Sequence, residues 1–230
     1  LLPALSVGIL AADQMKLGSE LQRLEQLGVG IIHVDVMDGC FCPPITVGDG
    51  YVRALATTML KDVHLMVREP LGKLESYAQA GADIITVHVE AAIHIHRVLQ
   101  HLGNLEHVQG PGHGIVRGLA LNPGTPLEWL TGPLLEEVDM VALLGVDPGW
   151  SGQKLAPATL SRVARTKERM ASSGKDIVLC VDGGIAKDNI AELAAAGADM
   201  VAAGSAVFAG GALEENYRLM SGAVQGRPSA

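Results

Sequence analysis

Hydrophobic and polar positions alternate along the chain in two repeating patterns. Short apolar runs typical of buried strands occupy residues 4–9, 30–36, 62–67, 83–89, 115–121, 140–146, 176–181 and 200–203. Segments with apolar residues at helical spacing, each ending at a glycine, include residues 17–28, 70–81, 158–174 and 187–197. We therefore expect eight strand–helix pairs.

The alternation of strand-like and helix-like segments is typical of a parallel sheet whose strands are joined by helices. Eight such units favour a closed (β/α)8 TIM barrel over an open doubly wound sheet. The phrases AGADIITVH and AGADMVAAG each join a helix-ending glycine to a buried strand. No segment has the composition of a linker, so we expect one α/β domain over residues 1–230.

One polar stretch, GNLEHVQGPGHG at residues 103–114, interrupts this regularity between the fourth expected helix and the fifth expected strand. In a barrel, a connection from helix to strand lies at the face opposite the active site. We therefore expect His107 and His113 to be solvated loop residues rather than ligands.

Polar residues at the carboxyl ends of barrel strands are the first candidates for chemistry. On the second expected strand, His33 and Asp35 are two residues apart and face the same side, with Met37 continuing the row. Asp38 faces the other way and precedes a glycine, so a turn or capping role is expected for it.

Two further strands carry residues of the same kinds. On the third strand, in KDVHLMV, we expect only His64 to share the facing of Met66. On the seventh, Asp182 directly precedes a Gly-Gly turn. A single buried histidine is ordinarily a core residue, but two histidines and two aspartates at strand ends favour a metal site. Imidazole and carboxylate without thiolate suit Zn, Fe(II), Mn or Co.

Three glycine-rich loops follow the last three strands: DPGWSGQ at residues 147–153, DGGI at 182–185 and AGSAVF at 203–208. Phosphate sites in barrels are commonly built there from backbone N–H groups. Any one of these loops is also an ordinary tight turn, but the three together predict a phosphorylated small molecule. His88, at the end of the fourth strand, is either a pocket residue or a core histidine.

Composition and charge narrow the possible partners. A net charge of −8 argues against a nucleic-acid partner, which needs clustered Lys and Arg. Three cysteines without a C-x-x-C pair predict neither a disulfide framework nor a zinc ribbon and favour a reducing compartment. No apolar run has the length of a membrane span and no signal sequence opens the chain, so we expect a cytoplasmic location and no membrane partner.

Seven motifs in the same order resemble the ribulose-phosphate 3-epimerase family: HVDVMDGCFCPPITVG, DVHLMV, ADIITVHVEA, GLALNPGTPLEWL, DPGWSGQK, VDGGI and GADMVAAGSAVF. The resemblance implies a (β/α)8 isomerase of carbohydrate metabolism, in the pentose phosphate pathway, that is usually a dimer or larger homo-oligomer. The implied reaction interconverts D-ribulose 5-phosphate and D-xylulose 5-phosphate through a metal-stabilised enediolate.

The resemblance also implies the site residues. The metal ligands would be His33, Asp35, His64 and Asp182, and the two aspartates would also be the acid/base catalysts. The positions that hold the substrate phosphate or line its loops would be Gly149, Trp150, Ser151, Gly152, Gly183, Gly184, Gly204 and Ser205. The expected pocket lining is Gly8, Met37, Met66 and Leu144.

The chain departs from the family pattern at four places. Gly8 replaces a serine that contacts substrate, Pro44 replaces an asparagine, Leu144 replaces a methionine, and GWSG replaces the phosphate-loop pattern GFGG. These departures leave an alternative substrate open, another ketose phosphate such as allulose 6-phosphate. A phosphosugar lyase is less favoured because DVMD lacks a lysine. A non-catalytic sugar-phosphate binder would not need both aspartates.

Overall fold

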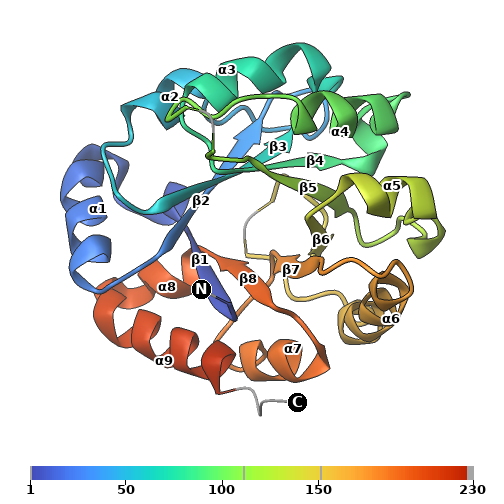
Figure 1. The fold of residues 1–230 in the computed structure, drawn as a ribbon. Helices are drawn as coiled ribbons and strands as arrows, with labels where there is room; N and C mark the ends of the chain where they lie inside the picture. Colours follow the sequence, from blue (N-terminus) through green and yellow to red (C-terminus); the bar gives the residue numbers. More distant parts are fainter. Residues whose placement is uncertain (1, 111, 151, 227–230) are drawn as a thin grey trace.

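The structure is a computed structural model that describes residues 2–110, 112–150 and 152–226. Eight parallel strands form a closed barrel in the order β1 to β8, with each strand paired to its neighbours in sequence and β8 paired to β1 (Figure 1). The strands are β1 Ala4–Gly8, β2 Ile31–Met37, β3 Leu60–Met66, β4 Ile84–His88, β5 Val116–Leu121, β6 Met140–Leu144, β7 Val178–Asp182 and β8 Met200–Ala203.

Helices surround the barrel as an outer ring (Figure 1). The α-helices are α1 Leu17–Gln26, α2 Asp49–Ala54, α3 Leu74–Gln79, α4 Ile95–Gly103, α5 Gly132–Glu137, α6 Thr159–Ala171, α7 Ile190–Ala196, α8 Ser205–Phe208 and α9 Leu213–Gln225. Short 3-10 turns are η1 Ile9–Ala11, η2 Gln14–Lys16, η3 Pro70–Lys73, η4 Val89–Ala91, η5 Leu127–Trp129 and η6 Ala209–Gly211.

The (β/α)8 barrel predicted from the sequence is confirmed. All eight expected strands are present, and each end lies within about two residues of the expected one because the period-two pattern locates strands better than it locates their ends. The expectation of a single domain over residues 1–230 stays a prediction, because residues 1, 111, 151 and 227–230 lie outside the described part.

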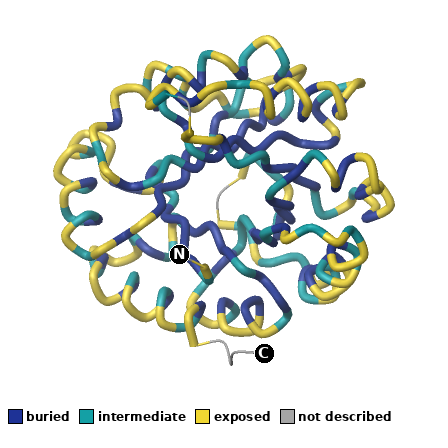
Figure 2. The backbone as a smooth tube through the Cα atoms, viewed as in Figure 1, coloured by how far each residue is buried: buried dark blue, intermediate teal, exposed yellow. Residues whose placement is uncertain are grey.

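Alternate residues of each strand face two different cores. One set, which includes Val7, Val34 and Val63, packs between the strands and the helices. The other set fills the barrel itself with side chains such as Ile31, Met140 and Met200. Figure 2 shows buried residues concentrated in the strands, whereas the outer helices carry both buried and exposed residues. A packed interior leaves the carboxyl ends of the strands as the place for polar groups.

The register between β2 and β3 corrects one expectation about facing. His33 pairs with Asp62, Asp35 with His64, and Met37 with Met66. Asp62 therefore shares the inward facing of His64 and is 1% exposed, as two-residue periodicity requires. The expectation that, of these two residues, only His64 shares the facing of Met66 was wrong.

The 103–114 stretch connects α4 to β5, as expected, but its two histidines differ. His113 is exposed, whereas His107 is buried, so the expectation that both are solvated was wrong for His107. His107 Nδ1 accepts a hydrogen bond from the Gln109 amide, and Nε2 lies 3.6 Å from the Asp83 carboxylate. Nε2 is buried beside Asp83 at the amino end of β4 but makes no hydrogen bond among the described residues.

The cysteines Cys40, Cys42 and Cys180 are all free thiols. Among the residues that the structure describes, no helix combines the length and the apolar character needed to cross a bilayer.

Candidate active site

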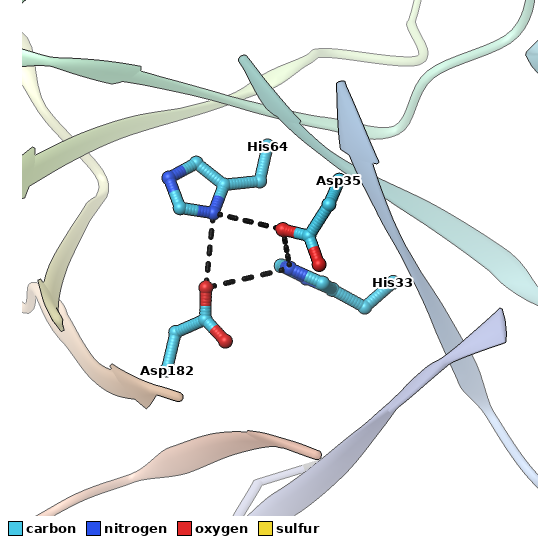
Figure 3. A group of neighbouring side chains, drawn as sticks. All are labelled: His33, Asp35, His64 and Asp182. Carbon is cyan, nitrogen blue, oxygen red and sulfur yellow. Dashed lines mark hydrogen bonds and ion pairs between the residues drawn. The ribbon is translucent and has the colours of Figure 1, made fainter. Parts of the chain in front are cut away.

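Four side chains converge at the carboxyl ends of β2, β3 and β7 (Figure 3). His33 Nε2 lies 3.2 Å from Asp35 Oδ1 and 3.5 Å from Asp182 Oδ2. His64 Nδ1 lies 2.9 Å from Asp182 Oδ2 and 3.4 Å from Asp35 Oδ1. One ligand atom from each residue lies within 4.8 Å of the other three, which is a grouping that could hold a metal ion.

Strand geometry explains why residues so distant in sequence meet. His33 and Asp35 are alternate residues of one strand, so both point inward. His64 is the register partner of Asp35 on the neighbouring strand. Asp182 is the last residue of β7, which is separated from β2 by β8 and β1 in the closed barrel.

The two imidazoles lie in a strongly negative environment. Burial opposes a charged ring, but the three surrounding carboxylates, Asp62 foremost, outweigh it and hold the pKa of His33 well above its usual value. Burial is likewise outweighed at His64, whose pKa is raised to about 9 by hydrogen bonds and charge from Asp182 and Asp35. The centre of the cluster therefore favours positive charge, which two imidazolium protons or a divalent cation would supply.

The two carboxylates respond in the opposite direction. Burial would raise the pKa of Asp35 and of Asp182, but the charge and hydrogen bonding of His33 outweigh burial and lower both values. Both groups therefore remain carboxylates at neutral pH. Asp35 is the more exposed of the two, with 29% of its side chain accessible against 13% for Asp182.

The other ring nitrogen of His33 has a partner beneath the cluster. His33 Nδ1 lies 2.7 Å from Asp62 Oδ2, and the same oxygen accepts a hydrogen bond of 3.0 Å from Ser6 Oγ. Asp62 Oδ1 is buried and has no partner among the described residues. With Nδ1 engaged in this way, His33 Nε2 faces the common centre, the space between the facing atoms of His33, Asp35, His64 and Asp182.

His64 also uses its second nitrogen. His64 Nε2 lies 2.8 Å from His88 Nε2, and the two ring planes are 12° apart. His88 Nδ1 lies 3.1 Å from Glu90 Oε2. Burial, only partly opposed by Glu90, lowers the pKa of His88 to about 4, so this ring is neutral. His88, which the sequence left open, therefore lies behind a candidate ligand rather than on the pocket wall.

Asp38 has the turn role that its position predicts. Its Oδ1 accepts hydrogen bonds from the amides of Cys40 and Phe41, and its Oδ2 accepts one from the Arg68 amide. Despite opposing burial, these amide bonds and Lys73 lower the pKa of Asp38 to about 2.

A cavity of about 920 Å³ opens beside the four-residue cluster. Its walls include His33, Asp35 and Asp182, together with the loops after β6, β7 and β8. Of the expected phosphate and pocket residues, those that line it are Gly8, Met37, Trp150, Gly152, Gly183, Gly184, Gly204 and Ser205.

The remaining expected residues lie elsewhere. Met66 and Leu144 are buried at 2% and 4% exposure and do not line this cavity. Gly149 lies against the β2–α2 loop, where an added Cβ would be 3.1 Å from Pro44 and 3.2 Å from Cys42. Ser151 lies outside the described residues.

Two cavity glycines are required by their surroundings. Gly184 has φ +71°, and a Cβ there would lie 3.0 Å from the Leu155 backbone. Gly204 approaches β1 so closely that a Cβ would lie 2.7 Å from the Gly8 carbonyl oxygen. Only glycine, which has no Cβ, fits these two positions without moving the neighbouring backbone.

A closed parallel barrel with a buried histidine and aspartate cluster at its carboxyl ends defines a (β/α)8 barrel enzyme, because the active sites of such barrels lie at that face. The sequence profile described as the ribulose-phosphate 3 epimerase family matches residues 4–208. The chain belongs to this family, which confirms the resemblance of its motifs. It is thus an epimerase, an enzyme of the isomerase class that acts on carbohydrates.

Individual relatives cover most of the chain. Ribulose-phosphate 3-epimerase of Bacillus subtilis (strain 168) is 39% identical over 203 residues, which are 87% of this chain and 89% of that protein. The Escherichia coli (strain K12) protein of the same name is 40% identical, with 87% and 86% covered. A putative epimerase LsrE of Salmonella paratyphi A is 38% identical over 215 residues, with 93% and 84% covered.

Solved structures agree on the fold alone. KGPDC from Streptococcus mutans has a TM-score of 0.70 at 15% identity, and the match covers 100% of both chains. The 3-hexulose-6-phosphate synthase of Salmonella typhimurium has a TM-score of 0.66 at 16% identity, with 97% of this chain and 99% of that one covered.

Sequence reasoning missed the residues that lie behind the histidines. Asp62 and Ser6 carry a period-two signal, since each is in register with the inward row of its own strand. Glu90 gives no such signal, because it lies in η4 beyond the end of β4. Its contact with His88 arises only from the turn of the chain there.

Proposed function

We propose that this protein is a metal-dependent epimerase that inverts C3 of a ketose phosphate and interconverts D-ribulose 5-phosphate and D-xylulose 5-phosphate. The observation that carries the proposal is the convergence of two carboxylates from different strands on shared imidazoles. Asp35 and Asp182 both lie within 3.5 Å of His33 Nε2. The names of the Bacillus and Escherichia relatives support the choice of sugar.

The donor set suits a divalent cation held by His33, Asp35, His64 and Asp182. One atom of each residue is directed at the common centre, and the second ring nitrogen of each histidine is already engaged. Zn, Fe(II), Mn and Co all accept imidazole and carboxylate ligands. When bound, such an ion would stabilise negative charge developing on the substrate oxygens.

Inversion of a carbon next to a ketone requires one proton to leave from one face and another to arrive on the opposite face. Asp35 on β2 and Asp182 on β7 are separated in the barrel by β1 and β8, so they approach a substrate from different sides. We assign one as the base and the other as the acid, with the roles exchanged in the reverse reaction.

The glycine-rich end of the cavity supports a phosphate group on the substrate. Gly183, Gly184, Gly204 and Ser205 lie together on its wall. Backbone N–H groups bind phosphate oxygens without a lysine or arginine. This assignment places the phosphate at the loops after β7 and β8 and the sugar carbons toward the aspartates.

A second candidate substrate is a hexulose phosphate such as allulose 6-phosphate. Gly8 lines the cavity and offers no side-chain hydroxyl to a sugar. Without a hydroxyl contact at this position, the other residues that line the cavity must discriminate between a pentulose and a hexulose. A lyase is disfavoured because the strand end from Asp35 to Asp38 contains no lysine.

Proton NMR in deuterated water tests the proposal directly. The metal-loaded protein is incubated with ribulose 5-phosphate and, separately, with allulose 6-phosphate, and the C3 proton signal is followed. Loss of that signal from ribulose 5-phosphate, with xylulose 5-phosphate appearing, is the expected result. Exchange with the hexulose phosphate alone would select the second candidate. A folded, metal-loaded protein that exchanges neither would overturn the proposal.

The homo-oligomeric state and the cytoplasmic location stay predictions.

A further inference from the structure

The His64 imidazole has two neighbours that compete for its protons. Nδ1 faces the carboxylates of Asp35 and Asp182 at the common centre, and Nε2 faces His88. A ring nitrogen binds a metal only when it carries no proton. If Nδ1 is the ligand atom, the one proton of the neutral His64 ring must be on Nε2, and His88 must accept it.

His88 can accept that hydrogen bond in only one of its tautomers. Its Nε2 must be bare, so its own proton must be on Nδ1, which lies 3.1 Å from Glu90 Oε2. His88 is 0% exposed, so bulk water does not take the place of either partner. A carboxylate can only accept a hydrogen bond, so His88 Nδ1 must be the donor to Glu90.

We propose that Glu90 is a positioning residue for the metal centre: acting through His88, it fixes His64 in the tautomer that leaves Nδ1 free to bind the ion. The chain of hydrogen bonds runs from His64 Nε2–H to His88 Nε2, and from His88 Nδ1–H to Glu90. This inference rests on the metal site of the proposed function. It adds to that site two residues that touch neither the ion nor the substrate.

The surroundings of Glu90 hold its carboxylate in a fixed orientation. Oε1 accepts a hydrogen bond of 2.9 Å from the Asn122 amide and another from Thr125 Oγ1. Both donors belong to the loop between β5 and η5. With Oε1 engaged by this loop, Oε2 remains for His88. Glu90 therefore links the β5 loop to a ligand on β3.

Glu90→Gln separates this role from simple packing, because the amide has almost the shape of the carboxylate. The Asn122 amide needs an acceptor, so the Gln oxygen takes the Oε1 position and the NH2 group faces His88 Nδ1. His88 must then accept at Nδ1 and carry its proton on Nε2, where it opposes the proton on His64 Nε2. His64 can relieve this conflict only by moving its proton to Nδ1, the ligand atom.

Chelator competition with Zn(II) and Mn(II) measures the consequence. We expect Glu90→Gln to raise the metal dissociation constant by about 10- to 100-fold, the usual range when the partner of a ligating histidine is lost. Glu128→Gln is the matched control, since Glu128 is an exposed glutamate of η5 with no imidazole contact among the described residues. The control should retain the wild-type constant, and a folded Glu90→Gln protein that also retained it would overturn the proposal.

Nitrogen-15 NMR of histidine in the wild-type, metal-loaded protein tests the same proposal without any substitution, which matters if Glu90→Gln does not fold. We expect protons on Nε2 of His64 and on Nδ1 of His88. A proton on Nε2 of His88 would overturn the inference. Failure of the wild-type protein to bind either ion would instead contradict the proposed function, so the two failures are distinguishable.

Discussion

Asp62→Asn is the most direct probe of the buried support beneath His33. Asp62 Oδ2 lies 2.7 Å from His33 Nδ1 and accepts a hydrogen bond of 3.0 Å from Ser6 Oγ. The residue is 1% exposed. Asparagine has nearly the same shape but offers one neutral acceptor and one NH2 group. Neither orientation of the amide restores the wild-type contacts.

The magnitude follows from these contacts. If the amide oxygen faces His33, the NH2 group takes the place of Oδ1, which has no partner among the described residues, and a buried donor without an acceptor costs about 1–3 kcal/mol of folding stability. If the NH2 group faces His33, that ring must carry its proton on Nε2, the candidate ligand atom. In either orientation the ring loses a carboxylate partner, so we expect metal affinity to fall by about 10- to 100-fold.

Two measurements check this prediction. The metal dissociation constant is measured by chelator competition, and the free energy of unfolding is measured by urea denaturation of the metal-free protein. Asp176→Asn, at an exposed position, is the control for loss of one negative charge. A folded Asp62→Asn protein with a metal dissociation constant within about twofold of wild type would refute the view that Asp62 orients His33 for binding.

Three further outcomes are expected. Asp182→Asn should leave the barrel folded but abolish epimerisation, and continued exchange of the C3 proton at the normal rate would contradict the two-carboxylate mechanism. The pKa of Asp38 is about 2 in the folded protein against 3.8 as the ordinary value, so its stabilising effect is complete above pH 3.8 and is lost as the pH falls toward 2. Acid titrations should show Asp38→Asn losing less stability over that window than wild type, by about 1 kcal/mol after solvent screening. Gly118→Ala should cost about 1–3 kcal/mol in urea denaturation, because its Cβ would lie 2.9 Å from Thr86 Cβ inside the barrel, and an unchanged midpoint would refute this.

The barrel was predictable because its determinants are local and repeated. Period-two apolar runs and helical segments ending at glycine occur in every part of the chain, and a parallel sheet follows from their alternation. His33 and Asp35 could be placed on one face from their spacing alone. Asp62 obeys the same spacing rule, yet the sequence reading put it on the wrong face.

The contacts behind the candidate ligands were not predictable in the same way. His107 was expected in solvent because it lies in a polar loop, but the fold of that loop brings it to Asp83. His88 and Glu90 are two residues apart at a strand end, and only the turn into η4 lets them touch. Such contacts depend on the path of one turn rather than on a repeating pattern.

The amino-acid order alone was enough to infer the eight-fold alternation, the inward row of polar residues on β2 and the glycine-rich loops after the last three strands. Each of these depends on the spacing of neighbouring residues. The contact of Asp182 with His33 and His64 depends on the folded barrel, because closure leaves only β8 and β1 between β7 and β2. Which nitrogen of each histidine faces the four-residue cluster depends on the fold as well, because ring orientation is set by partners such as Asp62 and His88 that come from other strands.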